Sequence, residues 1–274
     1  MKALFPIFSK PRDVSEFFKV RPGESVPSRF PRAIMVDVGV EDPKTGDYTK
    51  NAIKSVGLSE YFSYVRRFWN DITLFIVPDS HDVNEHFKRL DESINYFERV
   101  RFYDVMRYGV PIVVCHYCDD DKILRTTLEK AIEVRKLWHS VVIGIPGTII
   151  TSARGKFKCV EDINKCNKFI ASLITKLVDA GFSRDIHVLG IRKKTFTYLH
   201  EVGLARHVLS ADTDAFDIAP NEKAKRELQR KRKCSGCYQV NSDPELMDEW
   251  YLEWFKPYEP ILTVEEWLLG EGLR

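Results

Sequence analysis

The order of segments along this chain predicts an α/β fold, in which eight parallel strands close into a (β/α)8 barrel of the TIM type. From residue 33 to 217, apolar runs of strand length alternate with segments whose apolar residues recur at helical spacing. Such alternation indicates parallel strands joined by right-handed helical crossovers. No glycine-rich phosphate-binding turn follows the first strand, which favours a closed barrel over an open doubly wound sheet.

The strands and helices are expected in a regular order along the chain. Six apolar runs read as strands, at residues 33–38, 73–77, 111–115, 141–145, 186–189 and 207–211. Helices are expected over 58–69, within 81–108, after Asp119 to Asp121, over 169–180 and near 195–202. The regions 40–57 and 81–110 have room for the two further strands that a closed barrel needs.

Composition divides the chain into three parts. Residues 1–30 are rich in Pro, Phe and Arg without clear periodicity, and we expect them to wrap over the body of the fold. Residues 31–222 are expected to form the catalytic barrel. Residues 223–274 hold a basic helix, a Cys-x-x-Cys pair and a Trp-rich tail, a helical and zinc-like extension packed on the barrel.

Length and composition are those of an ordinary globular protein. The chain has 274 residues, 44% of them hydrophobic and 30% charged, enough for one barrel-sized domain. Six cysteines in a chain of this length do not suggest a secreted disulfide scaffold. The first residues hold too few apolar side chains for a signal peptide, and no stretch approaches the roughly 18 apolar residues of a spanning helix. We therefore expect a soluble, cytoplasmic protein without a membrane partner.

Three carboxylates follow the last predicted strand within six positions, Asp212, Asp214 and Asp217. One of them could cap a helix, but three exceed what a cap requires. In a barrel the carboxyl ends of the strands build the active site. Those ends carry polar or glycine residues, namely Asp37, Asp79, His116, Gly144, Gly190 and Asp212.

Carboxylates at the carboxyl ends of barrel strands suit the chemistry of glycosidic bonds. One carboxylate can attack the anomeric carbon while another moves protons at the leaving group. A third acid, Asp79, could accept hydrogen bonds from the N–H groups of a nucleobase. The alternative is that Asp37 and Asp79 only cap loops.

From about residue 33 to 240, the order of motifs resembles the tRNA-guanine transglycosylases and their DNA-modifying relatives. Asp37-Val38-Gly39 is similar to the Asp-Ser-Gly at the end of the family's first barrel strand, and Asp79 lies where the family has its base-recognising Asp. Val114 to Tyr117 stands in place of Val-Gln-Gly-Gly, and Ile186 to Gly190 resembles the His-Val-Leu-Gly strand. Asp212 to Phe216 resembles the Asp-Ser-Ala-Ala-Tyr of archaeal members.

The resemblance implies roles for these residues. Asp37 would be the general base and Asp212 the nucleophile; if the Phe-Asp pair is aligned instead, the nucleophile would be Asp217. The base would contact Asp79, His116, Tyr117, Gly144 and Gly190. Val38 replaces the family's Ser, and His116-Tyr117 replace its Gln-Gly pair.

The short chain is most similar to the compact DNA-guanine transglycosylases. That likeness implies exchange of guanine in DNA for a 7-deazaguanine base through a covalent Asp–sugar intermediate, on a nucleotide flipped out of the stack. The same exchange on tRNA is the nearest alternative. A nucleic-acid-binding barrel without catalysis, and an unrelated barrel hydrolase acting on a small glycoside, are alternatives of other classes. A homodimer is left open.

A basic run and four cysteines complete the candidate sites. Between residues 223 and 233, seven basic residues stand against one Glu, and they form either a solvated helix face or a surface for phosphates: Lys223, Lys225, Arg226, Arg230, Lys231, Arg232 and Lys233. The family's zinc motif is reduced here to Cys234 and Cys237, which Cys159 and Cys166 could complete to four thiolates. A structural zinc ion is therefore a candidate cofactor, and no organic cofactor is expected.

Overall fold

The computed structural model describes residues 5–8, 17–20, 33–36, 57–67, 72–80, 82–100, 109–147, 149–152, 155–158 and 161–213, together with residues 226 and 230. Its strands are β1 (Phe5–Phe8), β2 (Phe17–Val20), β3 (Ala33–Val36), β4 (Ile72–Ile76), β5 (Val110–Val114), β6 (Val142–Pro146), β7 (Ile149–Ser152), β8 (Gly155–Lys158), β9 (Ile186–Leu189) and β10 (Ser210–Thr213). Its helices are α2 (Leu58–Arg67), α3 (Val83–Val100), α4 (Asp121–Trp138), α5 (Ile163–Asp179), α6 (Lys193–Glu201) and the 3-10 turn η3 (Ala205–His207).

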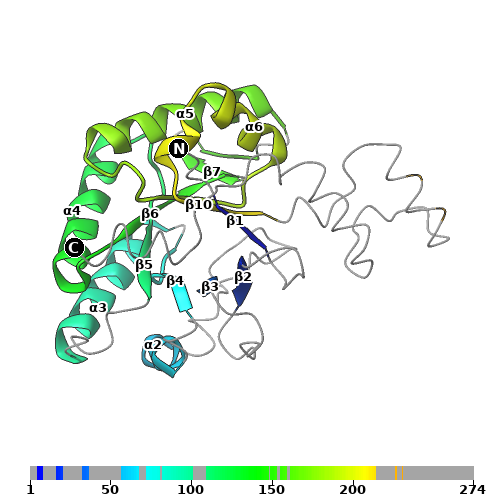
Figure 1. Ribbon diagram of the computed structural model, residues 1–274. Helices are drawn as coiled ribbons and strands as arrows, with labels where there is room; N and C mark the ends of the chain where they lie inside the picture. The colour runs from blue at the N-terminus through cyan, green and yellow to red at the C-terminus, as the bar shows by residue number, and fades with distance from the viewer. Residues whose placement is uncertain are drawn as a thin grey trace.

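The strands form a parallel, curled sheet that alternates with helices, as the sequence predicts (Figure 1). Their hydrogen bonds link them in the closed order β1-β10-β9-β6-β5-β4-β3-β2, and each of these pairings is parallel. All eight strands therefore end at the same edge. The remaining two, β7 and β8, pair antiparallel in a separate hairpin.

Helices cover the outer face of the sheet. Helix α3 packs on α4, and α5 packs on α6 (Figure 1). The buried positions of α4 recur every three or four residues, as expected for a helix with one face against a sheet: Leu124, Thr127, Ala131, Val134 and Trp138. Asp120 caps this helix by accepting the backbone N–H groups of Lys122 at 2.9 Å and Ile123 at 3.0 Å.

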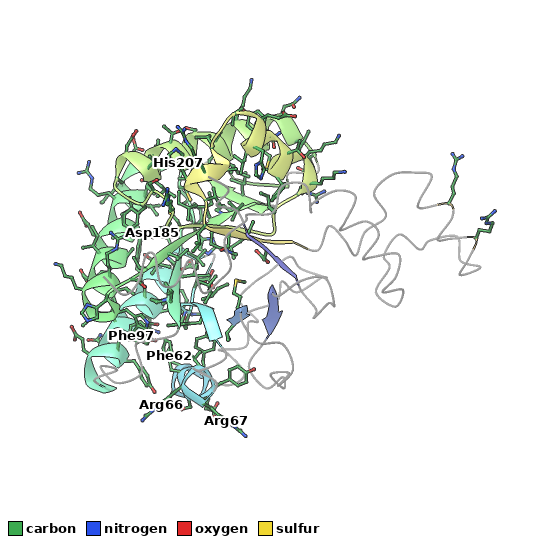
Figure 2. All side chains as sticks on the ribbon, in the orientation of Figure 1. Phe62, Arg66, Arg67, Phe97, Asp185 and His207 are labelled. Carbon is green, nitrogen blue, oxygen red and sulfur yellow. The ribbon has the colours of Figure 1, made fainter. Side chains whose placement is uncertain are left out.

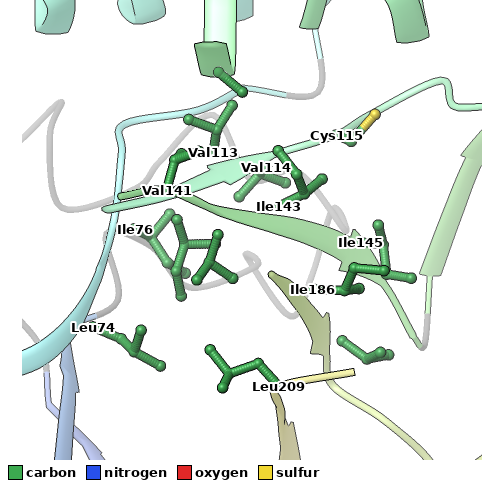
Figure 3. Close-up of a cluster of buried hydrophobic side chains, with 14 of the residues drawn as sticks. Leu74, Ile76, Val113, Val114, Cys115, Val141, Ile143, Ile145, Ile186 and Leu209 are labelled. Atoms are coloured by element: carbon green, nitrogen blue, oxygen red, sulfur yellow. The ribbon is translucent and has the colours of Figure 1, made fainter. Parts of the chain in front are cut away.

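The core fills the space between sheet and helices. Figure 3 shows its aliphatic part, where Val113, Ile143 and Ile186 on neighbouring strands are fully buried. An aromatic cluster continues it between α2, α3 and β4. The Phe62 and Phe97 rings, labelled in Figure 2, have centroids 4.9 Å apart. Strands buried on both faces explain the near-continuous apolar runs of the sequence.

Some strands lie where the sequence did not predict them. Two strands lie in the segment that was expected to wrap over the fold, since β1 and β2 hydrogen-bond to each other and to β10 and β3. Residues 83–100 form the helix expected within 81–108. Residues 40–56 and 101–108, where further strands had room, lie outside the described residues. The β7–β8 hairpin occupies a stretch expected to be a polar loop. A Pro inside β1 argues against a strand, and β2 lies in a segment without clear periodicity.

None of the helices in the described part of the chain combines the length and apolar character needed to cross a membrane.

Candidate active site at the carboxyl ends of the strands

Asp212 is a buried carboxylate in β10, only 7% exposed. One of its oxygens, Oδ1, accepts the backbone N–H of Gly190 at 2.6 Å and lies 3.3 Å from Nε2 of His187. Gly190 follows β9 directly and has a φ of 65°, a conformation that favours glycine. The turn after β9 is thereby shaped to direct a main-chain donor at Asp212.

His187 and Ser210 extend this cluster inward. The two residues are paired across β9 and β10, so their side chains lie on the same face of the sheet. Nδ1 of His187 is 2.8 Å from Oγ of Ser210, and both residues are at most 2% exposed. Asp212 lies two positions after Ser210 and so shares that face. The result is a continuous chain of hydrogen-bonding groups from Ser210 through His187 to Asp212.

A second cluster lies where β4 and β5 end. Oδ2 of Asp79 is 2.8 Å from Nε2 of His116, which is 8% exposed. The backbone beyond both strands stays paired, because Val77 N–H donates to Ile112 O and Cys115 N–H to Gly144 O. Asp79 and His116, both expected at strand ends, are thus in contact with each other.

Helix α3 places three more polar side chains against this pair. Arg89 donates from Nη1 to the carbonyl of Asp79 at 2.5 Å and from Nε to Oε1 of Glu85 at 2.9 Å. The His86 ring lies perpendicular to that of His116, with centroids 5.4 Å apart. Burial, and secondarily the neighbouring His116, lower the pKa of His86 to about 3. Among the described residues neither ring nitrogen of His86 finds a hydrogen-bond partner.

Gly144 in β6 lies between the two clusters, since it pairs with Val114 on one side and His187 on the other. A Cβ atom at this position would come within 2.8 Å of Cγ2 of Ile112. Close packing inside the sheet is therefore sufficient to explain this glycine, whether or not a base lies against it.

Tyr117 and the nearby cysteines complete the end of β5. Tyr117 has a φ of 52°, and its carbonyl accepts the N–H of Asp120 at 3.0 Å. Cys115 and Cys118 are both reduced and buried. The Cys118 thiol donates to the carbonyl of Cys115 at 2.8 Å, and burial raises its pKa, so its thiolate is disfavoured.

Several predicted site residues lie outside the described residues: Asp37, Asp214, Asp217, Cys159, Cys234, Cys237, Lys223, Lys225, Lys231, Arg232 and Lys233. Arg226 and Arg230 have helical backbone and are exposed. Cys166 is buried in α5 and disulfide-bonded, with its partner outside the described ranges. A disulfide sulfur offers no thiolate, so a zinc site that includes Cys166 requires its reduction. Within the described ranges no three His, Cys, Asp or Glu side chains are arranged to hold a metal ion.

Sequence reasoning missed His187, Ser210, His86 and Arg89. His187 had a detectable signal, because it is the one polar residue in an otherwise apolar strand. Arg192, Lys193 and Lys194 also follow β9 directly and open α6, whose N-cap residue makes no side-chain capping bond. This basic turn belongs to the same edge of the sheet as Gly190.

The fold and these clusters define a parallel α/β protein with two acid–histidine pairs at or beyond the carboxyl ends of its strands, the buried pair His187–Asp212 and the partly buried pair His116–Asp79. Comparisons of the chain with models of known families, with curated proteins and with solved structures find no match.

Proposed function

We propose that the chain is a (β/α)8-barrel glycosyltransferase that replaces guanine in DNA with a 7-deazaguanine base, with Asp212 as the nucleophile. One observation carries the proposal: a buried carboxylate near the end of β10 whose Oδ1 accepts the Gly190 N–H at 2.6 Å and lies 3.3 Å from Nε2 of His187. A carboxylate oriented in this way suits covalent catalysis at a sugar carbon.

In the first step, an oxygen of Asp212 forms a bond to C1′ of the flipped nucleotide while the bond from C1′ to the guanine nitrogen breaks. Guanine leaves with the bonding electron pair and takes up a proton. In the second step, the incoming base loses a proton, attacks C1′ and releases Asp212 as a carboxylate. Proton transfer in both steps is the role assigned to Asp37.

Recognition of the base is assigned to the second cluster. Asp79 and His116, held together at 2.8 Å, offer hydrogen-bonding groups to the edge of a guanine. Arg89 donates to the backbone carbonyl of Asp79, and His116 contacts its carboxyl group. Both contacts restrict the position of that carboxyl group. A rigid hydrogen-bonding site discriminates strongly against a base that lacks the matching groups.

Nucleic-acid phosphates are assigned to basic residues at this edge. Arg192 is the N-cap residue of α6, and Lys194 lies in its first turn. This helix follows the seventh strand of the ring, a position where barrels frequently bind phosphate. The run from Lys223 to Lys233 would add contacts to further phosphates of the nucleic acid.

The experiment is incubation of the protein with labelled guanine and either DNA or tRNA. Label should enter DNA with the wild type, and no label should enter with Asp212→Asn. Entry into tRNA alone would assign the exchange to RNA. Binding of either polymer without label entry would favour a barrel that binds nucleic acid without catalysis.

A structural zinc ion remains part of the proposal, with Cys234 and Cys237 as two of its ligands. Metal analysis of protein purified under reducing conditions, without added zinc, should find about one zinc per chain. Cys237→Ser should lose it. Wild-type protein without zinc would remove the ion from the proposal and leave base exchange unaffected.

A further inference from the structure

Ser210 and His187 take no part in the bond changes described above, although they are buried more deeply than the nucleophile Asp212 to which they are linked. His187 is fully buried and Ser210 is 2% exposed, so neither can reach a nucleic acid. Burying a polar side chain in a sheet interior is unfavourable unless the side chain is hydrogen-bonded. Here both ring nitrogens face a polar atom, at 2.8 Å and 3.3 Å.

The geometry restricts how protons are distributed along this chain. A carboxylate that attacks a sugar carbon is ionised, and an ionised oxygen only accepts hydrogen bonds. Nε2 of His187 therefore carries a proton toward Oδ1 of Asp212. In the neutral ring Nδ1 is then bare, and the Ser210 hydroxyl donates to it.

We propose that His187, oriented by Ser210, is a positioning residue that holds the Asp212 carboxylate in its reactive orientation through the Nε2–H tautomer. The inference rests on the proposed function, because it assigns a role in presenting Asp212 for attack. Two donors from different elements converge on Oδ1, the main chain after β9 and the imidazole within it. Together they fix the plane of the carboxyl group.

A direct measurement of the tautomer does not depend on catalysis. Nitrogen NMR of histidine-labelled protein distinguishes a protonated ring nitrogen from a bare one, and His187→Gln identifies the signal by its loss. The expected result is a proton on Nε2 and none on Nδ1. A ring protonated at Nδ1, alone or together with Nε2, would overturn the assignment.

Matched substitutions then test positioning. His187→Leu keeps a similar volume without a donor, whereas His187→Gln places an amide N–H near the position of Nε2. His187→Leu should lower kcat for base exchange about 100-fold with little change in KM, since a misplaced reacting group costs about that factor. His187→Gln should recover part of the loss. Ser210→Ala should lower kcat and Ser210→Thr, which keeps the hydroxyl, should restore it.

The outcomes separate the two proposals. Wild-type protein that exchanges no base in DNA or tRNA overturns the proposed function, whatever the tautomer. Exchange that proceeds at the wild-type rate in folded His187→Leu overturns the positioning role and leaves the function standing. If His187→Leu does not fold, the tautomer of the wild type and the Ser210→Ala and Ser210→Thr pair still decide the positioning role.

Discussion

Asp212 and His86 are both buried polar residues, but they differ in the hydrogen-bond partners that surround them. Asp212 accepts the Gly190 N–H and lies 3.3 Å from Nε2 of His187, so its burial is matched by polar contacts. The His86 ring is 3% exposed and finds no partner for either nitrogen among the described residues. The first arrangement suits a reacting group, and the second makes the folded state sensitive to acid.

Asp212→Asn is expected to abolish base exchange while the protein still folds, because the two side chains are almost equal in volume. Asn keeps an oxygen that can accept the Gly190 N–H, but the amide is a poor nucleophile. A covalent adduct with nucleic acid, detected on denaturing gels, should form in the wild type and not in this variant. Asp214→Asn and Asp217→Asn serve as controls and should still form it. An adduct that survives in Asp212→Asn and vanishes in Asp217→Asn would assign the nucleophile to Asp217.

His86 should make the folded state less stable in acid. Its pKa is about 3 in the folded protein and about 6.5 when exposed, so below pH 6.5 the unfolded chain binds a proton that the folded protein does not. The free energy of unfolding should therefore fall as pH drops from about 6.5 toward 3. Between about pH 8 and about pH 5, this residue alone should lower the free energy of unfolding by roughly 2 kcal/mol.

Urea unfolding of the wild type and of His86→Phe across this range measures the effect. The phenylalanine fills a similar space and does not titrate, so its acid dependence should be weaker by about that amount. Equal pH dependence of the two proteins would contradict the buried neutral state of His86.

At the scale of single elements, helix ends and strand ends follow local chemistry. The start of α4 is fixed by Asp120, whose side chain accepts two main-chain N–H groups. The start of α5 is fixed in the same way by Asp162, which accepts the N–H of Lys165 at 2.9 Å. The Asp162 cap explains why α5 begins at Ile163, six residues before residue 169, where the apolar stripe predicted its start.

Asp120→Ala should lower the free energy of unfolding by about 1 kcal/mol, the usual cost of losing such a cap. Asp120→Asn is the matched control, because its amide oxygen still accepts the same N–H groups. Its free energy of unfolding should fall by only a few tenths of a kcal/mol. Chemical unfolding of the three proteins compares them. Equal losses in both variants would assign the effect to the charge and not to the cap.

Elements with a strong local pattern could be predicted from the sequence, whereas elements defined by distant partners could not. Strand β9 was predicted with its bounds, because a compact apolar run is enclosed by turn residues. Strands β1 and β2 have four residues each and become strands only by pairing with segments elsewhere in the chain. The site shows the same division. Asp79, His116 and Asp212 stand out at strand ends, but the contact of His187 with Ser210 depends on the register between two strands.

For the whole molecule, charge distribution matters more than the net charge of +2. The basic run from Lys223 to Lys233 and the basic residues Arg192, Lys193 and Lys194 at the start of α6 add to the potential felt by a polyanion. Binding that depends on such contacts weakens with salt, because each phosphate contact releases condensed counterions.

Replacing Arg230, Lys231, Arg232 and Lys233 by Ala should weaken DNA binding and flatten its salt dependence, with a slope smaller by up to about 3 or 4. A control with the same charge change removes four exposed lysines on other helices: Lys88, Lys122, Lys136 and Lys168. Fluorescence anisotropy over a salt series measures both slopes. Equal slopes in the two variants would leave the run without a specific role in binding.

The closure of the ring has a consequence for biosynthesis. Strand β1 pairs with β10 in the register Ile7↔Asp212, so the first of the described strands joins the last of them, about 200 residues later. At a translation rate of about 5–20 residues per second, the early strand waits roughly 10–40 s on the ribosome with an unpaired edge. Contacts this distant in sequence also form slowly after release. A chain that is stalled or truncated before β10 therefore leaves β1 without this partner and Asp212 without its place in the sheet.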